Sequence, residues 1–155
     1  MVEHWFYHLE QSSLEQILPE LLEKTYANKW RALVKIGPLL GEAPLELKRL
    51  DDYLWAYKKD GFLPHGRDDE PLADAQPILL SVDKQSLSGE DVILLIGGAE
   101  MGDVSSAKRC ITILNGADDE DKTIARTRWK QAKDDGLVTA YWRQNDFGKW
   151  EQPFK

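Results

Sequence analysis

The chain has 155 residues, of which 42% are hydrophobic and 30% are charged, which suits one globular domain with a core of its own. Its formal net charge of -7 argues against wrapping DNA or lying on an anionic membrane, because phosphate binding needs a net basic face. Cys110 is the only cysteine, so no disulfide can form within the chain. The N-terminus carries Glu3 and His4 where an export signal would be basic and then apolar, so we expect a cytoplasmic protein.

The chain opens with the pattern of a strand followed by a helix. Residues 5–9 predict a strand because they are aromatic and apolar. Two serines follow, with Glu15 and Gln16 three positions after them, and either serine can cap a helix that runs to about Asn28. Pro19 should kink or delay this helix, because proline lacks the backbone N–H that a helix interior uses.

A second strand and helix follow. Residues 31–36 predict the strand, which stops at the Gly-Pro pair that comes next. The apolar spacing of residues 45–58 predicts a helix with one core-facing stripe, formed by Leu47, Leu50, Leu54 and Tyr57.

The rest of the chain holds three short apolar runs, one long helix and one more strand. The runs 77–81, 92–96 and 110–114 predict strands covered on both faces, at the centre of a sheet. Residues 118–134 predict the helix, with acidic residues in its first turn, and 137–143 predict a final strand.

This order of elements predicts an α/β, three-layer Rossmann-like domain with a mostly parallel central sheet flanked by helices. The whole of 1–155 is interpreted as one domain. The acidic loop 67–74 and the tail 145–155 are expected to be mobile, unless Trp150 and Phe154 dock the tail.

A search for nucleotide chemistry finds no complete motif. Gly97 and Gly102 have the spacing of the two glycines in a P-loop, but Asp103 stands where the phosphate-binding lysine is required. An acid at that position repels phosphate. The dinucleotide fingerprint G-x-G-x-x-G is missing as well, so we expect no cofactor.

The three histidines are His4, His8 and His65. His4 and His8 share one face of the first strand, but no cysteine or carboxylate lies at metal-ligand spacing beside them, so we expect no metal. His65 could be a general base, but no serine or cysteine declares itself as its nucleophile. A histidine bonded to backbone is the favoured interpretation of His65.

One aromatic residue lies off the core stripe of the helix 45–58. Trp55 falls beside Lys48 and Asp51 on the helical wheel, and a second apolar step, residues 62–64, follows it. An exposed indole beside such a step indicates a surface kept for a partner. The alternative is a loop that simply covers Trp55.

The helix 118–134 carries a basic stripe on an acidic protein. Trp129 borders the stripe, and Arg128 lies on the opposite, apolar side, where it should snorkel or pair with a carboxylate. Such a row beside an indole can hold a short acidic peptide with an apolar side chain; the alternative is a solvated face that balances nearby acids. The stripe consists of Lys122, Arg126, Lys130 and Lys133.

Taken in order, these motifs resemble the chi subunit of bacterial DNA polymerase III holoenzyme. The resemblance extends nearly to Trp142 and implies an α/β domain without catalytic activity. It also implies that this domain bridges the clamp loader to the single-stranded DNA-binding protein that coats the lagging-strand template. It is carried by Phe6-Tyr7, Leu50-Asp51, Leu54-Trp55, Phe62-Leu63-Pro64-His65-Gly66, Gln76-Pro77-Ile78 and the helix with Arg126, Arg128, Trp129 and Lys130.

The resemblance also implies two binding surfaces. The matching positions for a psi-like subunit of the clamp-loader complex are Trp55, Phe62, Leu63 and Pro64. Those for the acidic C-terminal tail of the single-stranded DNA-binding protein, which ends in Pro-Phe, are Lys122, Arg126, Trp129, Lys130 and Thr139. Trp129 stands where a tyrosine is usual, and the residues beyond Trp142 exceed the family pattern and could partly cover the pocket.

The resemblance therefore implies a replication adaptor, and the net charge of -7 argues against a direct DNA-binding module or a membrane partner. The alternative is a small α/β enzyme acting on an anionic substrate near the basic last helix. A convergent acid–base pair would distinguish the enzyme, and the sequence shows none.

Overall fold

The computed structural model describes residues 1–57, 63–67, 70, 76–82 and 90–153. Strands and helices alternate through these segments, and each described helix is too short or too polar to cross a lipid bilayer. The elements are β1 Glu3–Leu9, α1 Leu14–Ala27, β2 Ala32–Ile36, the 3-10 helix η1 Pro38–Leu40, α2 Ala43–Ala56, β3 Gly66–Arg67, β4 Ile78–Ser81, β5 Val92–Ile96, β6 Arg109–Asn115, α3 Asp119–Asp134, β7 Thr139–Gln144 and β8 Trp150–Glu151.

One sheet joins all of these strands in the order β3-β4-β2-β5-β6-β1-β7-β8. Neighbouring strands are parallel except for β8, which runs antiparallel to β7, so the predicted mostly parallel sheet is confirmed. Of the three apolar runs expected at the centre, β5 and β6 are central. The run that forms β4 lies next to the short edge strand β3, so its predicted position was wrong. It is still fully buried, because burial on both faces needs covering layers and not a central place.

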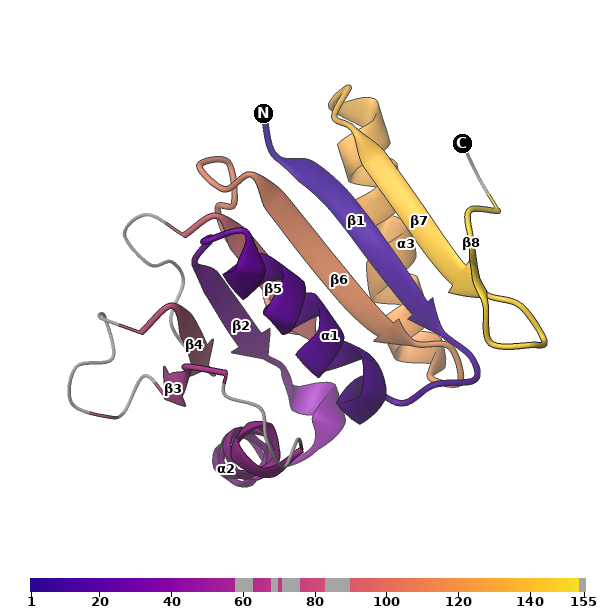
Figure 1. The fold of residues 1–155 in the computed structure, drawn as a ribbon. Helices are drawn as coiled ribbons and strands as arrows, with labels where there is room; N and C mark the ends of the chain where they lie inside the picture. The colour runs from indigo at the N-terminus through magenta and orange to yellow at the C-terminus, as the bar shows by residue number, and fades with distance from the viewer. Residues whose placement is uncertain (58–62, 68–69, 71–75, 83–89, 154–155) are drawn as a thin grey trace.

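Helices cover both faces of this sheet (Figure 1). Leu18 and Leu22 of α1 and Leu50 of α2 pack with the inward side chains of β2, β4 and β5 in the main core. On the other face, Ala125 of α3 packs with Phe6 of β1 and with Leu114 and Tyr141 from its neighbours. The three-layer arrangement is therefore confirmed.

The start of α1 follows the predicted capping signal. Ser13 is the residue before the helix, and its backbone N–H donates to Gln16 Oε1 at 2.8 Å, as in a capping box. Pro19 lies inside the helix and does not delay it. Because Pro19 has no N–H, the Glu15 carbonyl lacks its usual helical donor, and the Tyr53 hydroxyl of α2 donates to that oxygen at 2.8 Å.

The second helix begins two residues earlier than expected. Pro44 sits in the first turn of α2, where a missing N–H costs nothing, so the helix starts at Ala43. The predicted core stripe is confirmed for Leu47, Leu50 and Leu54, which are buried. The expected end at Lys58 lies outside the described residues.

The C-terminal segment forms structure that the sequence did not predict. Residues 150–151 pair with β7, and the rings of Trp150 and Tyr7 pack edge to face with their centres 5.3 Å apart. Trp150 therefore docks the tail. Phe154 lies outside the described residues. Gln144, at the end of β7, anchors the turn after β1: its Oε1 accepts from the backbone N–H groups of Glu10, Gln11 and Ser12 at 2.9 to 3.1 Å.

The glycine segment after β5 has a packing role. Gly97 adopts a φ of 61°, and a Cβ there would lie 2.6 Å from the Leu40 side chain. The Gly97 carbonyl also accepts from Leu39 N–H at 2.9 Å. This turn therefore fits closely against η1, which accounts for the glycine without phosphate binding.

Candidate functional site

A cationic pocket of about 260 Å³ opens between α3 and the outer strands β1 and β7. It combines four cationic side chains with two large aromatic walls. Its lining consists of His8, Lys122, Arg126, Trp129, Lys130, Tyr141 and Arg143.

The helix supplies most of this lining through simple periodicity. Lys122, Arg126 and Lys130 are four residues apart and therefore share one face of α3. Arg126 and Lys130 are exposed, as expected, and Trp129 lies half-buried beside them. The ammonium of Lys133 lies 5.4 Å from the centre of the Trp129 ring, outside the lining. The basic stripe thus borders a pocket with aromatic walls. A face that only balances nearby acids would have no need of such a pocket.

The strands supply the floor, which sequence reasoning missed. Phe6 pairs with Tyr141 and His8 with Arg143 across β1 and β7, and the alternation of the strands points His8 and Tyr141 toward α3. His8 Nδ1 lies 2.7 Å from the Tyr141 hydroxyl. Only the parallel pairing of β1 with β7 could have revealed these residues, because 133 positions separate them in the chain.

A carboxylate at the rim connects the floor to the last cation. Glu10 Oε1 lies 2.8 Å from His8 Nε2 and 3.2 Å from Arg143 Nη2. Burial lowers the pKa of His8, the Glu10 carboxylate opposes that shift, and the charges of Arg143 and Lys122 add to it. Burial likewise raises the pKa of Tyr141. Both floor groups are therefore held in their neutral forms.

Two expectations about this region need correction. Thr139 lies at the start of β7 opposite His4 and does not line the pocket. Arg128 was expected to snorkel or pair with a carboxylate. Its guanidinium instead donates to the Ala99 carbonyl and, at 3.4 Å, to Thr112 Oγ1, because α3 packs on β6 and brings Arg128 to the turn after β5. Burial lowers the pKa of Arg128.

The second candidate surface lies around Trp55. Trp55 is 51% exposed, so its predicted place off the core is confirmed. One face of its ring packs on His65, with the ring centres 4.1 Å apart. Asp51, expected on the same exposed face, is buried, because the residue 63–65 segment covers it. The loop therefore covers Asp51 and supports Trp55 without hiding it.

His65 is bonded to backbone, as predicted. Its Nδ1 lies 2.7 Å from the Leu63 carbonyl, and its Nε2 lies 3.2 Å from Asp51 Oδ1. Leu63 was expected at the partner surface but is buried in the main core, so it supports the loop from below. Pro64 is half-buried, and Phe62 lies outside the described residues.

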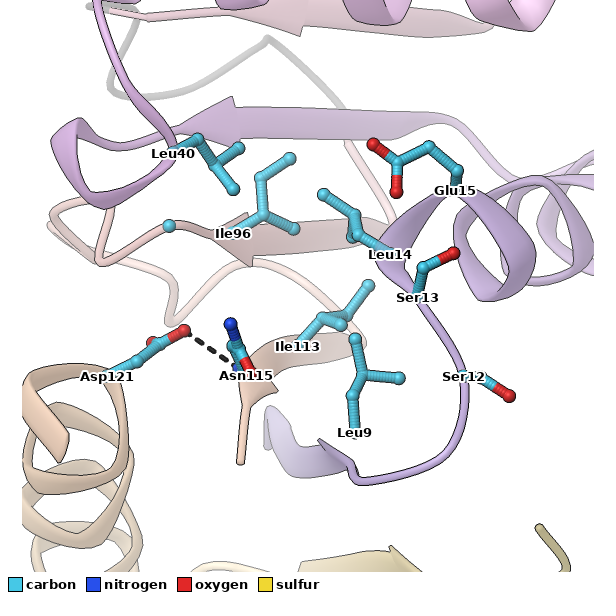
Figure 2. Close-up of a pocket in the computed structure, with 11 residues that line it drawn as sticks. Leu9, Ser12, Ser13, Leu14, Glu15, Leu40, Ile96, Ile113, Asn115 and Asp121 are labelled. Atoms are coloured by element: carbon cyan, nitrogen blue, oxygen red, sulfur yellow. Dashed lines mark hydrogen bonds between the residues drawn. The ribbon is translucent and has the colours of Figure 1, made fainter. Parts of the chain in front are cut away.

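A different pocket of about 250 Å³ lies at the carboxyl ends of β1, β5 and β6 (Figure 2). The chain leaves β1 for α1 on one face and β6 for α3 on the other, which makes this the switch point where α/β proteins often bind ligands. Its charged lining residues are Glu15 and Asp121, and Asp121 Oδ2 accepts from Asn115 N–H. Two carboxylates without a cation in the lining do not suit a phosphate or another anionic substrate.

The sequence matches the family described as DNA polymerase III chi subunit, HolC, over residues 1–140. This chain belongs to the chi subunit family. The family takes its description from a subunit of DNA polymerase III. The chain is also similar to a protein of Rickettsia prowazekii (strain Madrid E) named "Probable DNA polymerase III subunit chi", with 22% identity over 107 residues. That alignment covers 69% of this chain and 62% of the relative, less than two thirds of the relative's length.

The chi family match includes the whole Trp55 surface but only part of the cationic pocket. It contains Trp55, the basic face of α3 and His8. Tyr141 and Arg143 of the pocket floor and rim follow the last matched residue.

Proposed function

We propose that this chi family member is a non-catalytic adaptor that links a psi-like subunit of the clamp loader to the acidic C-terminal tail of single-stranded DNA-binding protein. The observation that carries the proposal is the cationic pocket on a chain of net charge -7. An acidic ligand is attracted by the four cations of this pocket and repelled by a surface that is acidic on balance, so the pocket is the favoured binding place.

The pocket suits a tail that ends in Pro-Phe for two reasons. Arg126 and Lys130 can form charge-assisted hydrogen bonds to the terminal carboxylate and to acidic side chains. Trp129 and Tyr141 offer aromatic walls to the terminal phenyl ring, whose burial gains free energy without charge. Neither contribution alone would select that tail.

The Trp55 surface suits the psi-like partner. An indole that is half exposed and supported from below by His65 is a rigid anchor, and such aromatic residues contribute far more to interfaces than their number suggests. Pro64, which is half-buried, precedes His65 in the same loop. The two surfaces lie on opposite faces of the sheet, so both partners can bind at once.

One observation favours the alternative of an enzyme acting on an anionic substrate. The His8–Glu10 pair beside the cationic pocket is an acid–base pair of the kind that the sequence did not show. The pocket lining, however, holds no serine, threonine or cysteine that could act as its nucleophile, and His8 is buried with Nδ1 engaged by Tyr141. The arrangement therefore supports binding better than catalysis.

The decisive experiment titrates a labelled tail peptide against the wild type, Lys130→Ala and Lys24→Ala by fluorescence anisotropy. Removing one partner of a charge-assisted hydrogen bond costs about 1.5 to 3 kcal/mol, so Lys130→Ala should weaken binding about tenfold or more. Lys24 is exposed on α1, across the sheet, so its variant removes the same charge without touching the pocket.

Two further comparisons sharpen this test. A peptide without its final Phe should lose at least as much affinity as the Lys130→Ala variant, because the phenyl ring loses its apolar site. Added salt should weaken the contact only in part, since ring burial is not screened. Equal affinities for the wild type and Lys130→Ala, or no binding to either, would contradict this assignment of the pocket.

A further inference from the structure

The floor of the cationic pocket holds a chain of polar contacts, and the proposed function uses only the Tyr141 ring at its end. It runs from the Arg143 guanidinium through Glu10 and His8 to the Tyr141 hydroxyl, with separations of 3.2, 2.8 and 2.7 Å. Arg143 and Tyr141 belong to β7, His8 belongs to β1, and Glu10 lies in the turn after β1. The chain ends on a residue that lines the pocket.

The chemistry of the links dictates where the protons lie in the empty pocket. The contact between His8 Nε2 and Glu10 is a close ion-pair contact and not an aligned hydrogen bond. An ionised Glu10 offers only lone pairs, so the contact is favourable when Nε2 carries the ring hydrogen and repulsive when it does not. A neutral imidazole has only one N–H, so Nδ1 is then an acceptor and the Tyr141 hydroxyl donates to it. The burial of His8 favours this neutral form.

A carboxylate in the pocket changes that arrangement. It accepts hydrogen bonds and cannot donate, so it competes with His8 Nδ1 for the hydroxyl proton of Tyr141. When Tyr141 turns its proton to the ligand, its oxygen becomes an acceptor facing Nδ1. The lone pair of Nδ1 would then face the lone pairs of that oxygen, and a proton taken from solvent onto Nδ1 removes the repulsion.

We infer that His8 takes up a proton when an acidic peptide carboxylate binds the pocket, so that Tyr141 and His8 couple tail binding to pH. This inference rests on the proposed function and specifies its regulation. The charged groups that face His8 are Glu10 on its own turn, Arg143 on β7, and Lys122 on α3. The new positive charge is balanced on one side by Glu10 and on the other by the ligand.

The test measures binding of the same tail peptide at about pH 8 and about pH 6 at constant ionic strength, where one pKa unit of coupling amounts to about tenfold in affinity. The wild type should bind about threefold to tenfold more tightly at the lower pH. Calorimetry in buffers of different ionisation enthalpy should show uptake of a fraction of a proton per peptide bound. In His8→Gln and Tyr141→Phe both effects should disappear.

Two controls separate this coupling from general charge effects. His4→Gln removes another buried histidine of β1, outside the pocket lining, and should keep the pH dependence. Histidine NMR on the isotope-labelled wild type needs no variant: His8 should change from one ring N–H to two on peptide addition, while His4 and His65 stay unchanged.

The outcomes distinguish the two proposals. Binding at the higher pH that is unchanged at the lower pH, with one ring N–H retained on His8, overturns the proton coupling and leaves the adaptor function standing. Peptide binding at neither pH overturns both. Equal pH dependence in His8→Gln would also overturn the coupling, because some other group would then carry it.

Discussion

At the scale of single residues, the proposed partner surface depends on one indole and the imidazole beneath it. Trp55 covers the ring of His65, whose side chain has no exposure of its own. His65 in turn is held by the Leu63 carbonyl and by Asp51. Burial raises the pKa of Asp51, and the His65 ring opposes that shift. The exposed anchor therefore stands on a buried polar support, which fixes its direction.

Replacing the anchor should remove binding and spare the fold. In Trp55→Ala the core residues of α2 remain buried, so the free energy of unfolding should fall by about 1 kcal/mol or less. Association with a psi-like partner should lose about 2 kcal/mol or more, measured by calorimetry. Tyr26→Ala, which removes another exposed ring on α1, should bind like the wild type. Loss of cooperative melting in Trp55→Ala would show that the indole belongs to the core.

The single thiol should be inert in the folded protein. Cys110 is 1% exposed, and burial raises its pKa to about 12, so almost no thiolate is present at neutral pH. A thiol reagent should therefore modify Cys110 only after unfolding, at a rate that follows denaturant concentration. Rapid modification of the native protein, followed by absorbance, would contradict the buried position.

At the scale of elements, α1 and α2 are connected through a defect in α1. Pro19 leaves the Glu15 carbonyl without its helical donor, and the Tyr53 hydroxyl fills that place from α2. The same turn of α1 carries the Glu15 carboxylate, which pairs with Arg49 at 2.6 Å. A proline that weakens a helix in isolation thus directs how the next helix packs on it.

A double-mutant cycle can measure this connection. Tyr53→Phe should lower the free energy of unfolding by about 1 kcal/mol, because the carbonyl loses its donor. In a Pro19→Ala background the same change should cost clearly less, since the restored N–H of residue 19 already donates to Glu15. Urea unfolding of the four proteins gives the coupling energy. Additive effects would show that the hydroxyl bond and the missing N–H are independent.

At the scale of the whole molecule, the sheet holds two histidines in neutral form. His4 and His8 are buried on the α3 side of β1, and burial lowers the pKa of both. The unfolded chain then binds more protons than the folded chain in the range just below the ordinary histidine pKa of about 6.5. The stabilising contribution of the two neutral rings is present above that value and is lost as the pH falls through their folded pKa values.

Stability should therefore fall as the pH is lowered from about 7.5 to about 5.5. The urea midpoint measured across this range should decline less in His4→Gln, which has one buried histidine fewer. Asp51 and Asp121, whose pKa values burial raises, act in the opposite sense, but in the more acidic range where carboxylates titrate. A midpoint that is flat or rising over the histidine range would contradict this account.

The sequence by itself determined the layers of this protein, because hydrophobic periodicity and capping act over a few residues. The capping pair of Ser13 and Gln16, the stripe of α2 and the basic face of α3 were all predictable in this way. So was the exposed Trp55, which periodicity alone placed off the core. The resemblance to the chi family rested on the same local patterns, and the family match confirms it.

Only the tertiary structure decided which residues meet. Asp51 lies on the polar side of its helix, yet the 63–65 segment buries it, and Leu63 joins the core from a loop. His8 and Tyr141 come together because β1 pairs in parallel with β7, a long-range register that no local pattern specifies. Helix geometry is set within one turn of the chain, whereas strand partners are chosen by the whole sheet.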